Sequence, residues 1–349
     1  MPQPLVSVVT PVYNGAEFLD ECIQSVLRQT YTNFEYIIID NCSTDRTADI
    51  ASTYAQKDSR LRLHRNTDFV GVIENHNIAF SLISPAAKYC KVVSADDFIF
   101  EDCLTRMVGL GEEHPDVGII GSYQLSGRFI RWQGFTYPHS VLPGSEVCRR
   151  LLLRDQAFLG DRAVIGFGTP TSLMYRADLV RAPGGFYPNS SSEADTSACY
   201  KYLHVSDFGF VYQVLSYERI HEATQSAKSR DINRYVSSCL NDLIQYGAFY
   251  LSEGERERLI SDTLKRYYRY LAVNYFVGFR EKKFWVYHRN RLKELGFPFS
   301  YLRLLRAAVG TLLEEAVNPG NAVTKLWRRL PWRINRSGDP GFAGRQTAN

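Results

Sequence analysis

Short apolar runs alternate with amphipathic segments along the first third of the chain. Residues 5–10 and 34–40 are runs of mostly β-branched and aromatic residues, as in strands buried on both faces of a sheet. Between them, residues 17–29 place apolar side chains at the spacing of an amphipathic helix. The same pattern predicts strands at residues 61–65, 89–94 and 117–125, and helices at residues 72–83 and 102–113. A further helix is expected to follow a cap at Ser43 or Thr44 and to run through about residue 57. This alternation predicts an α/β fold with a mostly parallel sheet and helices on both faces.

The alternation loosens after residue 127 and becomes purely helical near residue 232. The predicted elements between these points are helices at 145–154 and 196–203 and strands at 171–176, 208–212 and 215–220. The predicted C-terminal helices are 232–250, 253–276, 283–295 and 301–315. The pattern divides the chain into an α/β domain at residues 1–226, a C-terminal helical region at 227–330 and a basic tail at 331–349. We expect this tail to be disordered.

Composition is that of a globular protein. Hydrophobic residues make up 45% of the 349 residues, enough for one large or two medium cores. No apolar run is long enough for a spanning helix, and the start (MPQP) lacks the features of a signal peptide. The seven cysteines are widely spaced and include no C-x-x-C pair, which is typical of reduced thiols. We therefore expect a cytoplasmic protein.

Charge is distributed unevenly. Residues 251–349 carry 19 Lys and Arg against 9 Asp and Glu, whereas residues 1–250 carry 22 against 28. The basic region can contact anionic lipid, phosphate or nucleic acid, or it can be a solvated helical surface. Trp327 and Trp332 stand among arginines there, as in segments at a membrane interface. Of the charged partners, we expect an anionic membrane surface on the inner membrane face and no nucleic acid.

Two adjacent carboxylates follow the predicted strand at residues 89–94. Asp96 and Asp97 come after a buried strand, where an acidic side chain loses solvation unless a cation pairs with it. A divalent ion bound to a phosphorylated ligand is one such cation. Alternatively, an Asp before a helix caps it by accepting backbone N–H groups. On this stretch alone, both interpretations stay open.

Polar residues also end the neighbouring strands. In an open α/β sheet, the carboxyl ends of the strands form the ligand site. The residues at these ends are Pro11, Tyr13, Asn14, Asp40, Asn41, Ser43, Ser94, Ala95, Asp96 and Asp97. No Gly-rich phosphate loop follows the first strand, so a diphosphate held here needs another source of positive charge. A divalent ion on Asp96 would supply it, since Mg²⁺ needs only one or two carboxylates besides phosphate oxygens and water.

The order of these motifs resembles that of family-2 glycosyltransferases, which have a nucleotide-sugar-binding fold of GT-A type. The matching segments are VSVVTPVYN at residues 6–14, IIIDNCSTD at 37–45, SADD at 94–97 and GGF at 184–186. The resemblance covers roughly residues 4–226 and makes that part a nucleotide-sugar-binding catalytic domain. It implies a GT-A type, Rossmann-like sheet followed by the C-terminal helical region.

The resemblance implies a role for each matching position. The nucleotide-sugar-binding residues would be Pro11, Tyr13, Asp40, Asn41, Ser43, His76, Asn77, Ser94, Ala95 and Asp97. Asp96 and the late His221 would meet the metal. The catalytic base would be Asp195, with Glu193 in reserve. The chain departs from the family pattern at Ser94, where the family has a first Asp, and at His76, where Arg is usual.

These roles predict a metal-dependent, inverting glycosyltransferase that uses Mn²⁺ or Mg²⁺. It would move a sugar from a nucleotide-diphosphate sugar to a glycan or lipid-linked acceptor, in cell-envelope or exopolysaccharide synthesis. A sugar-phosphate nucleotidyltransferase is disfavoured because the Gly-rich loop after the first strand is missing. A non-catalytic nucleotide-sugar-binding or scaffold protein is the other alternative, suggested by the residues at 76, 94 and 194.

Overall fold

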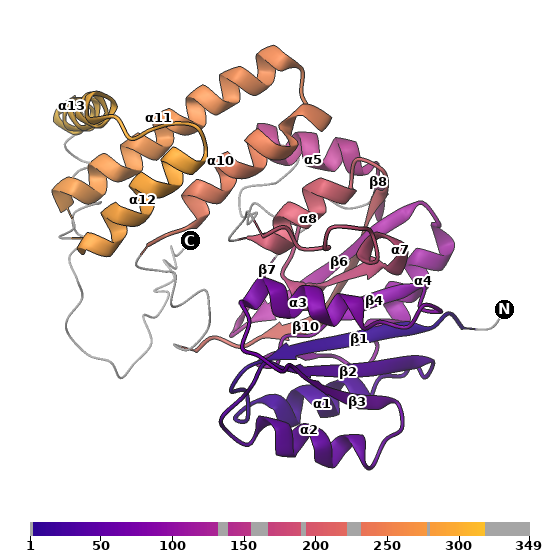
Figure 1. Ribbon diagram of the computed structural model, residues 1–349. Coiled ribbons are helices and arrows are strands. Elements are labelled where there is room, and N and C mark those ends of the chain that lie inside the picture. The colour runs from indigo at the N-terminus through magenta and orange to yellow at the C-terminus, as the bar shows by residue number, and fades with distance from the viewer. Residues whose placement is uncertain are drawn as a thin grey trace, which may run out of the picture. The chain divides into compact units, whose positions relative to one another are not determined.

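The computed structural model describes residues 3–131, 139–154, 167–189, 193–221, 232–277 and 280–317 (Figure 1). The chain divides into two compact units. The first comprises residues 1–264 and 281–299, and the second comprises residues 265–280 and 300–349. The first unit holds the sheet and the helices that cover it. The boundary expected at residue 226 stays a prediction.

In the part of the chain that the structure describes, a ten-stranded sheet forms the centre of the first unit. Its order is β3-β2-β1-β4-β9-β6-β10-β5, with β7 paired to β6 and β8 paired to β10. Its strands are β1 (Val6–Val12), β2 (Phe34–Asp40), β3 (Leu61–Arg65), β4 (Tyr89–Val92), β5 (Phe98–Ile99), β6 (Val117–Ser126), β7 (Phe129–Arg131), β8 (Val141–Leu142), β9 (Leu173–Arg176) and β10 (Asp207–Glu218). Most of the strands predicted from the apolar runs are therefore present.

The sheet is mixed, which refines the prediction of a mostly parallel one. Strands β3, β2, β1 and β4 are parallel neighbours, and so are β6 and β10. Strand β9 runs antiparallel to both β4 and β6. Because Lys91 on β4 lies opposite Met174 on β9, the start of β9 lies beside the end of β4. The antiparallel strand therefore brings the preceding 3₁₀ helix η1 (Pro170–Ser172) to the carboxyl end of β4.

Helices of the first unit cover both faces of the sheet (Figure 1). The helices of the described residues are α1 (Leu19–Leu27), α2 (Thr47–Ala55), α3 (Val72–Ser81), α4 (Cys103–Glu113), α5 (Gly144–Leu153), α7 (Ala177–Val180), α8 (Ala194–Tyr202), α10 (Tyr235–Tyr246), α11 (Glu253–Val277), α12 (Lys282–Glu294) and α13 (Tyr301–Val317), with a 3₁₀ turn η2 (Gly247–Phe249). Helices α1, α2 and α4 bury apolar side chains in one core, and α3, α5, α8 and α10 bury theirs in another.

Strand side chains alternate between these two cores. Val9 and Ile37 belong to the core under α3 and α8, whereas Val8 and Ile38 belong to the core under α1 and α4. Successive side chains of a strand point to opposite faces, so a strand covered on both faces must be apolar throughout. This is why the sequence shows continuous apolar runs there rather than alternating ones.

Three predicted boundaries were wrong, each for a local reason. Strand β1 continues through Pro11 to Val12, because β4 pairs with β1 only as far as Val9 and the missing N–H of Pro11 breaks no pairing there. Helix α2 begins at Thr47 rather than after a Ser43 or Thr44 cap. The strands expected at 208–212 and 215–220 form a single strand, β10, whose pairing with β6 shifts register near Val214.

No helix among the described residues is both long and apolar enough to cross a membrane. Helix α11 is the longest, but charged residues interrupt it along its length.

Candidate active site

The end of β2 places Asp40 at the carboxyl edge of the sheet. Its side chain is fully buried, and Arg65 on the paired strand β3 places Nε 3.1 Å from Asp40 Oδ2. The backbone N–H of Ser43 donates to Asp40 Oδ1 at 3.1 Å. A buried carboxylate needs such partners, because an unpaired one loses its hydration without compensation. The Asp40 carboxylate is thus fixed at the sheet edge.

The loops after β1 and β2 hold each other through side chains. Asn14 N–H donates to Ser43 Oγ at 2.9 Å, and Thr44 N–H donates to Asn14 Oδ1 at 2.8 Å. Asn14 itself has a left-handed φ of 51°, a conformation that Asn tolerates better than most residues. Ser43 and Thr44 are therefore engaged in a loop-to-loop contact, which explains why neither caps α2.

Two exposed aromatic rings stand at this edge. Tyr13, just beyond β1, is 49% exposed, and its ring centroid lies 4.8 Å from that of Phe69. Asn41 is buried, and its amide accepts from Val70 N–H at 3.0 Å and donates to Val70 O at 2.9 Å. The segment that carries Phe69 is thus tied to the end of β2. A planar base could stack on such a pair.

Helix α3 is joined to the turn that carries the Gly-Gly-Phe motif. The side chain of Asn77 donates to Tyr187 O and accepts from Tyr187 N–H, both at 2.9 Å. Gly185 has a φ of +84°, and a Cβ there would lie 3.2 Å from Asn77 Nδ2. Only glycine fits this turn without strain. Both polar groups of Asn77 are therefore engaged by the protein itself.

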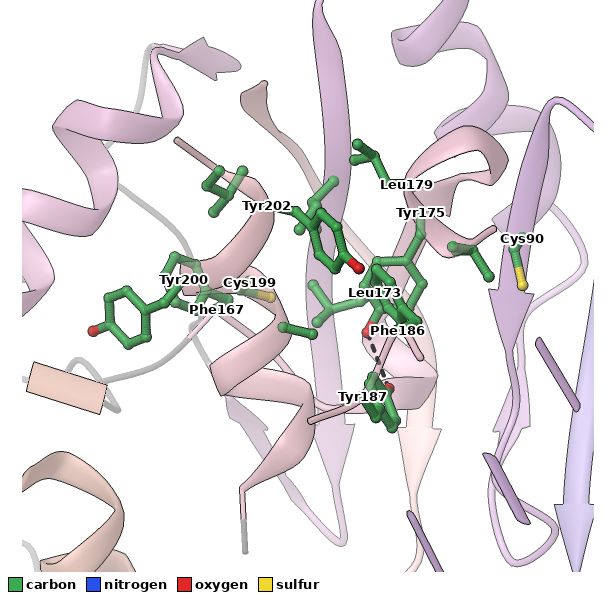
Figure 2. Packing of buried hydrophobic residues seen from close by; sticks show 14 of the residues in the cluster. Cys90, Phe167, Leu173, Tyr175, Leu179, Phe186, Tyr187, Cys199, Tyr200 and Tyr202 are labelled. Atoms are coloured by element: carbon green, nitrogen blue, oxygen red, sulfur yellow. Dashed lines mark hydrogen bonds between the residues drawn. The ribbon is translucent and has the colours of Figure 1, made fainter. Parts of the chain in front are cut away.

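An aromatic core lies beneath this turn (Figure 2). The Phe186 ring stacks on Tyr202 at 5.0 Å and meets Tyr175 edge-on at 4.8 Å. The hydroxyls of Tyr175 and Tyr187 lie 3.2 Å apart, as the dashed line in Figure 2 marks. His76 faces Tyr187 at 5.5 Å between ring centroids. Burial lowers the pKa of His76, which favours the neutral imidazole.

The Ser94–Asp97 segment is organised by Thr171 of η1. The Thr171 hydroxyl donates to Asp97 Oδ2 at 2.7 Å and accepts from Ser94 N–H at 3.0 Å. The Arg219 N–H donates to the other Asp97 oxygen at 3.1 Å. Asp97 is only 6% exposed. Burial, and then the nearby Asp96, raise the pKa of Asp97 to about 7. Ser94 and Asp97 are thus parts of an internal network.

Asp96 points away from this network to a partly exposed position. Its Oδ2 lies 3.0 Å from His221 Nε2, and the two side chains are 33% and 24% exposed. Arg219 donates from Nε to Asp96 O at 3.0 Å, and its guanidinium lies 4.6 Å from the Phe18 ring. Arg219 is also paired with Glu21. The two residues expected to meet the metal are therefore adjacent.

This pair is a fitting but incomplete ligand set for a divalent ion. Within the described ranges, no group of three or more His, Cys, Asp and Glu side chains could hold a metal ion. Mg²⁺ commonly takes one or two protein ligands and fills its remaining positions with phosphate oxygens and water. Asp96 and His221 supply one carboxylate oxygen and one ring nitrogen, so their chemistry fits an ion that arrives with a diphosphate.

Lys91 supports this segment from inside the sheet. Its side chain is fully buried, and Nζ donates to the carbonyl oxygens of Leu173, at 2.9 Å, and of Thr171. Burial lowers the pKa of Lys91. Thr171, Arg219 and Lys91 were not predicted from the sequence as site residues. Arg219 stands two residues before His221, which was a usable signal, but no local pattern marked Thr171.

The start of α8 carries a separate acidic cluster. Glu193 precedes the helix, Asp195 lies in its first turn, and the Ser197 hydroxyl donates to Asp242 of α10 at 2.5 Å. Burial raises the pKa of Asp195, and backbone N–H groups offset part of this effect. Burial and Asp195 raise the pKa of Glu193 to about 7. Burial is also the main cause that raises the pKa of Asp242 to about 7.

The fold of this chain matches structures of GT-A type. It aligns with residues 1–349 of TarS from S. aureus, in complex with UDP-GlcNAc, at a TM-score of 0.59 and 17% identity, over 83% of this chain and 80% of that one. It also aligns with the mannosyltransferase PcManGT from Pyrobaculum calidifontis, in complex with GDP-Man and Mn²⁺, at a TM-score of 0.53 and 15% identity, over 94% and 85% of the two chains.

The family follows from the sequence match. The model for glycosyl transferase family 2 matches residues 7–182, about half of the chain, and the chain therefore belongs to this family. It is 32% identical over 179 residues to a PGL/p-HBAD biosynthesis glycosyltransferase of Mycobacterium bovis, covering 50% of this chain and 66% of that protein. It is 31% identical over 119 residues to the glycosyltransferase GlyG of Streptococcus pneumoniae, covering 34% and 39%. The match thus spans less than two thirds of either relative.

Proposed function

We propose that this chain transfers a sugar from a nucleotide-diphosphate sugar to an acceptor hydroxyl, with inversion at the anomeric carbon. The observation that carries the proposal is the pairing of Asp96, which lies in the matched family-2 segment, with the later His221 at 3.0 Å. Asp195 at the start of α8 adds a carboxyl whose pKa is raised by burial. The two groups correspond to the two needs of sugar transfer, a stabilised leaving group and an activated hydroxyl.

On the donor side, Asp96 and His221 would hold a Mn²⁺ or Mg²⁺ ion together with the diphosphate. Such an ion neutralises charge on the departing diphosphate. Asp40, buried and oriented by Arg65, would accept hydrogen bonds from the base, while Pro11 and Tyr13 border it. Ser94, Ala95 and Asp97 would shape the floor beneath the sugar.

On the acceptor side, Asp195 would take the proton of the attacking hydroxyl. A general base works best when its pKa lies near the working pH, because it is then both ionised and basic. The raised pKa of Asp195 moves the group in this direction. Attack from the face opposite the diphosphate is a single displacement, which inverts the anomeric centre. Glu193 is the alternative base.

The donor class and the setting are further parts of the proposal. The solved structures of similar fold hold UDP-GlcNAc and GDP-Man, so we propose a nucleoside-diphosphate hexose as donor. The mycobacterial relative is named for PGL/p-HBAD biosynthesis. We therefore propose a glycan or lipid-linked acceptor of the cell envelope, with the enzyme in the cytoplasm against the inner membrane face. The basic C-terminal region suits an anionic surface.

The test is release of nucleoside diphosphate from a panel of UDP- and GDP-hexoses, with and without Mn²⁺. We expect turnover with one donor class, lost on chelation and restored by Mn²⁺. His221→Ala should raise the Mn²⁺ concentration for half-maximal activity about 10-fold or more. His114→Ala, which removes an exposed imidazole at the end of α4, is the matched control. Tight donor binding without turnover on any acceptor would instead support the non-catalytic binding protein.

A further inference from the structure

Helix α13 in the second unit exposes a continuous aliphatic stripe. The side chains of this stripe are Leu302, Leu305, Val309, Leu312 and Leu313, each between 47% and 61% exposed. At 3.6 residues per turn, these positions fall within a sector of about 100° around the helix axis. Scattered exposed apolar residues are ordinary, but five large ones on one helix face form a patch. Such a patch is typical of a surface that meets a partner.

The neighbouring face of α13 is the one that packs inside the unit. Ala308 is buried, and Leu304 and Thr311 are partly buried. The start of the helix is held to α11, where Ser300 N–H donates to the Tyr268 hydroxyl at 2.8 Å. The helix therefore has an inward face of its own, and the aliphatic stripe is additional to it.

The charges around the stripe are basic. Arg303 and Arg306 are both exposed in the first half of α13, and the acidic residues of the segment, Glu314 and Glu315, come only near its end. The adjoining sequence, residues 318–336, contains Lys325, Arg328, Arg329, Arg333 and Arg336, two tryptophans, and no Asp or Glu. Aliphatic side chains with Arg303 and Arg306 on the same helix, followed by a basic stretch of sequence, are complementary to the surface of an anionic bilayer.

We propose that the aliphatic stripe of α13 inserts into the interface of an anionic lipid bilayer and holds the enzyme at the membrane. A second copy of the chain fits less well. A stable dimer buries about 800 Å² per partner and involves roughly 20–30 residues a side, more than one stripe of five side chains offers. Two copies meeting through this face would also bring like charges together. The segment 318–336 is also a poor partner for the stripe, because its basic residues would be repelled by Arg303 and Arg306.

This inference rests on the proposed function only for the location of a lipid-linked acceptor. The stripe places no residue in the reaction, and it would act by raising the local concentration of enzyme at the membrane. Binding to lipid and release of nucleoside diphosphate in solution can therefore be measured separately. Loss of one without the other distinguishes failure of this inference from failure of the proposed activity.

The experiment is cosedimentation of the full-length chain with vesicles. The vesicles are phosphatidylcholine alone or an equal mixture of phosphatidylcholine and phosphatidylglycerol. We expect binding to the mixed vesicles, weakened by salt because part of it is electrostatic. The double variant Leu305→Glu/Leu312→Glu should lower vesicle affinity about 10-fold or more, because it removes apolar area and adds repulsive charge. Nucleoside diphosphate release in solution should be unchanged.

The matched control is Val205→Glu/Val286→Glu, which adds the same charge at exposed apolar positions outside the stripe. It should bind vesicles nearly as wild type does. The proposal would be overturned if the wild-type protein did not bind the mixed vesicles, or if the stripe variant bound them as well as the wild type does. A wild-type dimer that the stripe variant converts to monomer, without lipid binding, would assign the stripe to a second copy. If the Glu variant melts early by circular dichroism, Leu305→Ser/Leu312→Ser replaces it.

Discussion

The carboxyl groups at the edge of the sheet and at the start of α8 have opposite surroundings. At the sheet edge, Asp40 and Asp96 each have a basic side chain within about 3 Å, from Arg65 and His221. At α8, Glu193, Asp195 and Asp242 lie near one another. Burial raises the pKa of all three, and repulsion by Asp195 adds to the shift of Glu193 and Asp242. One region pairs its carboxylates with basic side chains, and the other raises the pKa values of its carboxyl groups by burial.

This contrast separates the two tasks of a sugar transfer. Carboxylates that contact a basic side chain are held in place, which suits binding of a metal and a diphosphate. Carboxyl groups with raised pKa values exchange protons near neutral pH, which suits general-base catalysis. Asp97 belongs to the sheet edge by position, but its burial and raised pKa show that it serves as an internal hydrogen-bonding group.

The largest expected effect is that of Asp195→Asn, which tests whether the carboxyl group at α8 is the general base. We expect the variant to lose about 10²–10⁴-fold in kcat, the range of general-base catalysis. Its donor affinity, measured by calorimetry, should stay within a few-fold of wild type, because the donor-side groups are untouched. Glu193→Gln is the matched control, a neutral amide at the other carboxyl of the same helix start, and should cost less. Full activity in Asp195→Asn would move the base to Glu193.

A smaller effect should follow from Thr171→Val, which acts on the donor side alone. The change removes the hydroxyl that donates to Asp97 and accepts from Ser94 while keeping the shape of the side chain. A buried polar group left without its partner costs about 1–3 kcal/mol. Urea unfolding should show this loss, and donor affinity should fall more than kcat in saturating donor.

Thr171→Ser is its control, since it keeps the hydroxyl and removes only a methyl group. It should recover most of the donor affinity, whereas the Val variant should not. Equal donor affinities for the Ser and Val variants would mean that the hydroxyl does not organise the Ser94–Asp97 segment. Contacts other than the Thr171 hydroxyl would then hold the Ser94–Asp97 segment.

Much of the sheet could be predicted from the sequence, because strands buried on both faces must be apolar throughout. The polar residues at the strand ends could be predicted in the same way, since each stands directly after an apolar run. The family resemblance is confirmed by the family match and the fold. The direction of β9 was not predictable, since periodicity reports burial and carries no information about strand orientation.

The supporting residues could not be predicted because their contacts span long stretches of chain. Thr171 meets Asp97 across 74 positions, and Arg219 meets it across 122. In the sequence, Asp242 is one polar position on an amphipathic helix, and a solvated face is the ordinary interpretation of such a residue. Only the packing of α10 against α8 places it near Asp195.

The smallest predicted effect concerns Asp242 and tests the acidic cluster at the start of α8 directly. Its pKa is about 7 in the folded chain, against about 3.9 for an unfolded Asp. Between these values, the native state holds a proton that the unfolded chain has released, so stability falls as pH rises from about 4 to about 7. Asp242→Asn cannot ionise and still offers an oxygen to Ser197, so it should lack this part of the decline.

Relative to wild type, Asp242→Asn should therefore gain stability, on the order of 1 kcal/mol, on going from pH 5 to pH 8. Denaturant unfolding at both values measures this, and Asp49→Asn, an exposed Asp on α2, controls for the change in net charge. Because the charge of Asp195 is one cause of the raised pKa of Asp242, Asp195→Asn should also weaken this pH dependence of stability. An unchanged pH dependence in Asp195→Asn would mean that Asp242 is not electrostatically coupled to Asp195, and burial would then be what raises the pKa of Asp242.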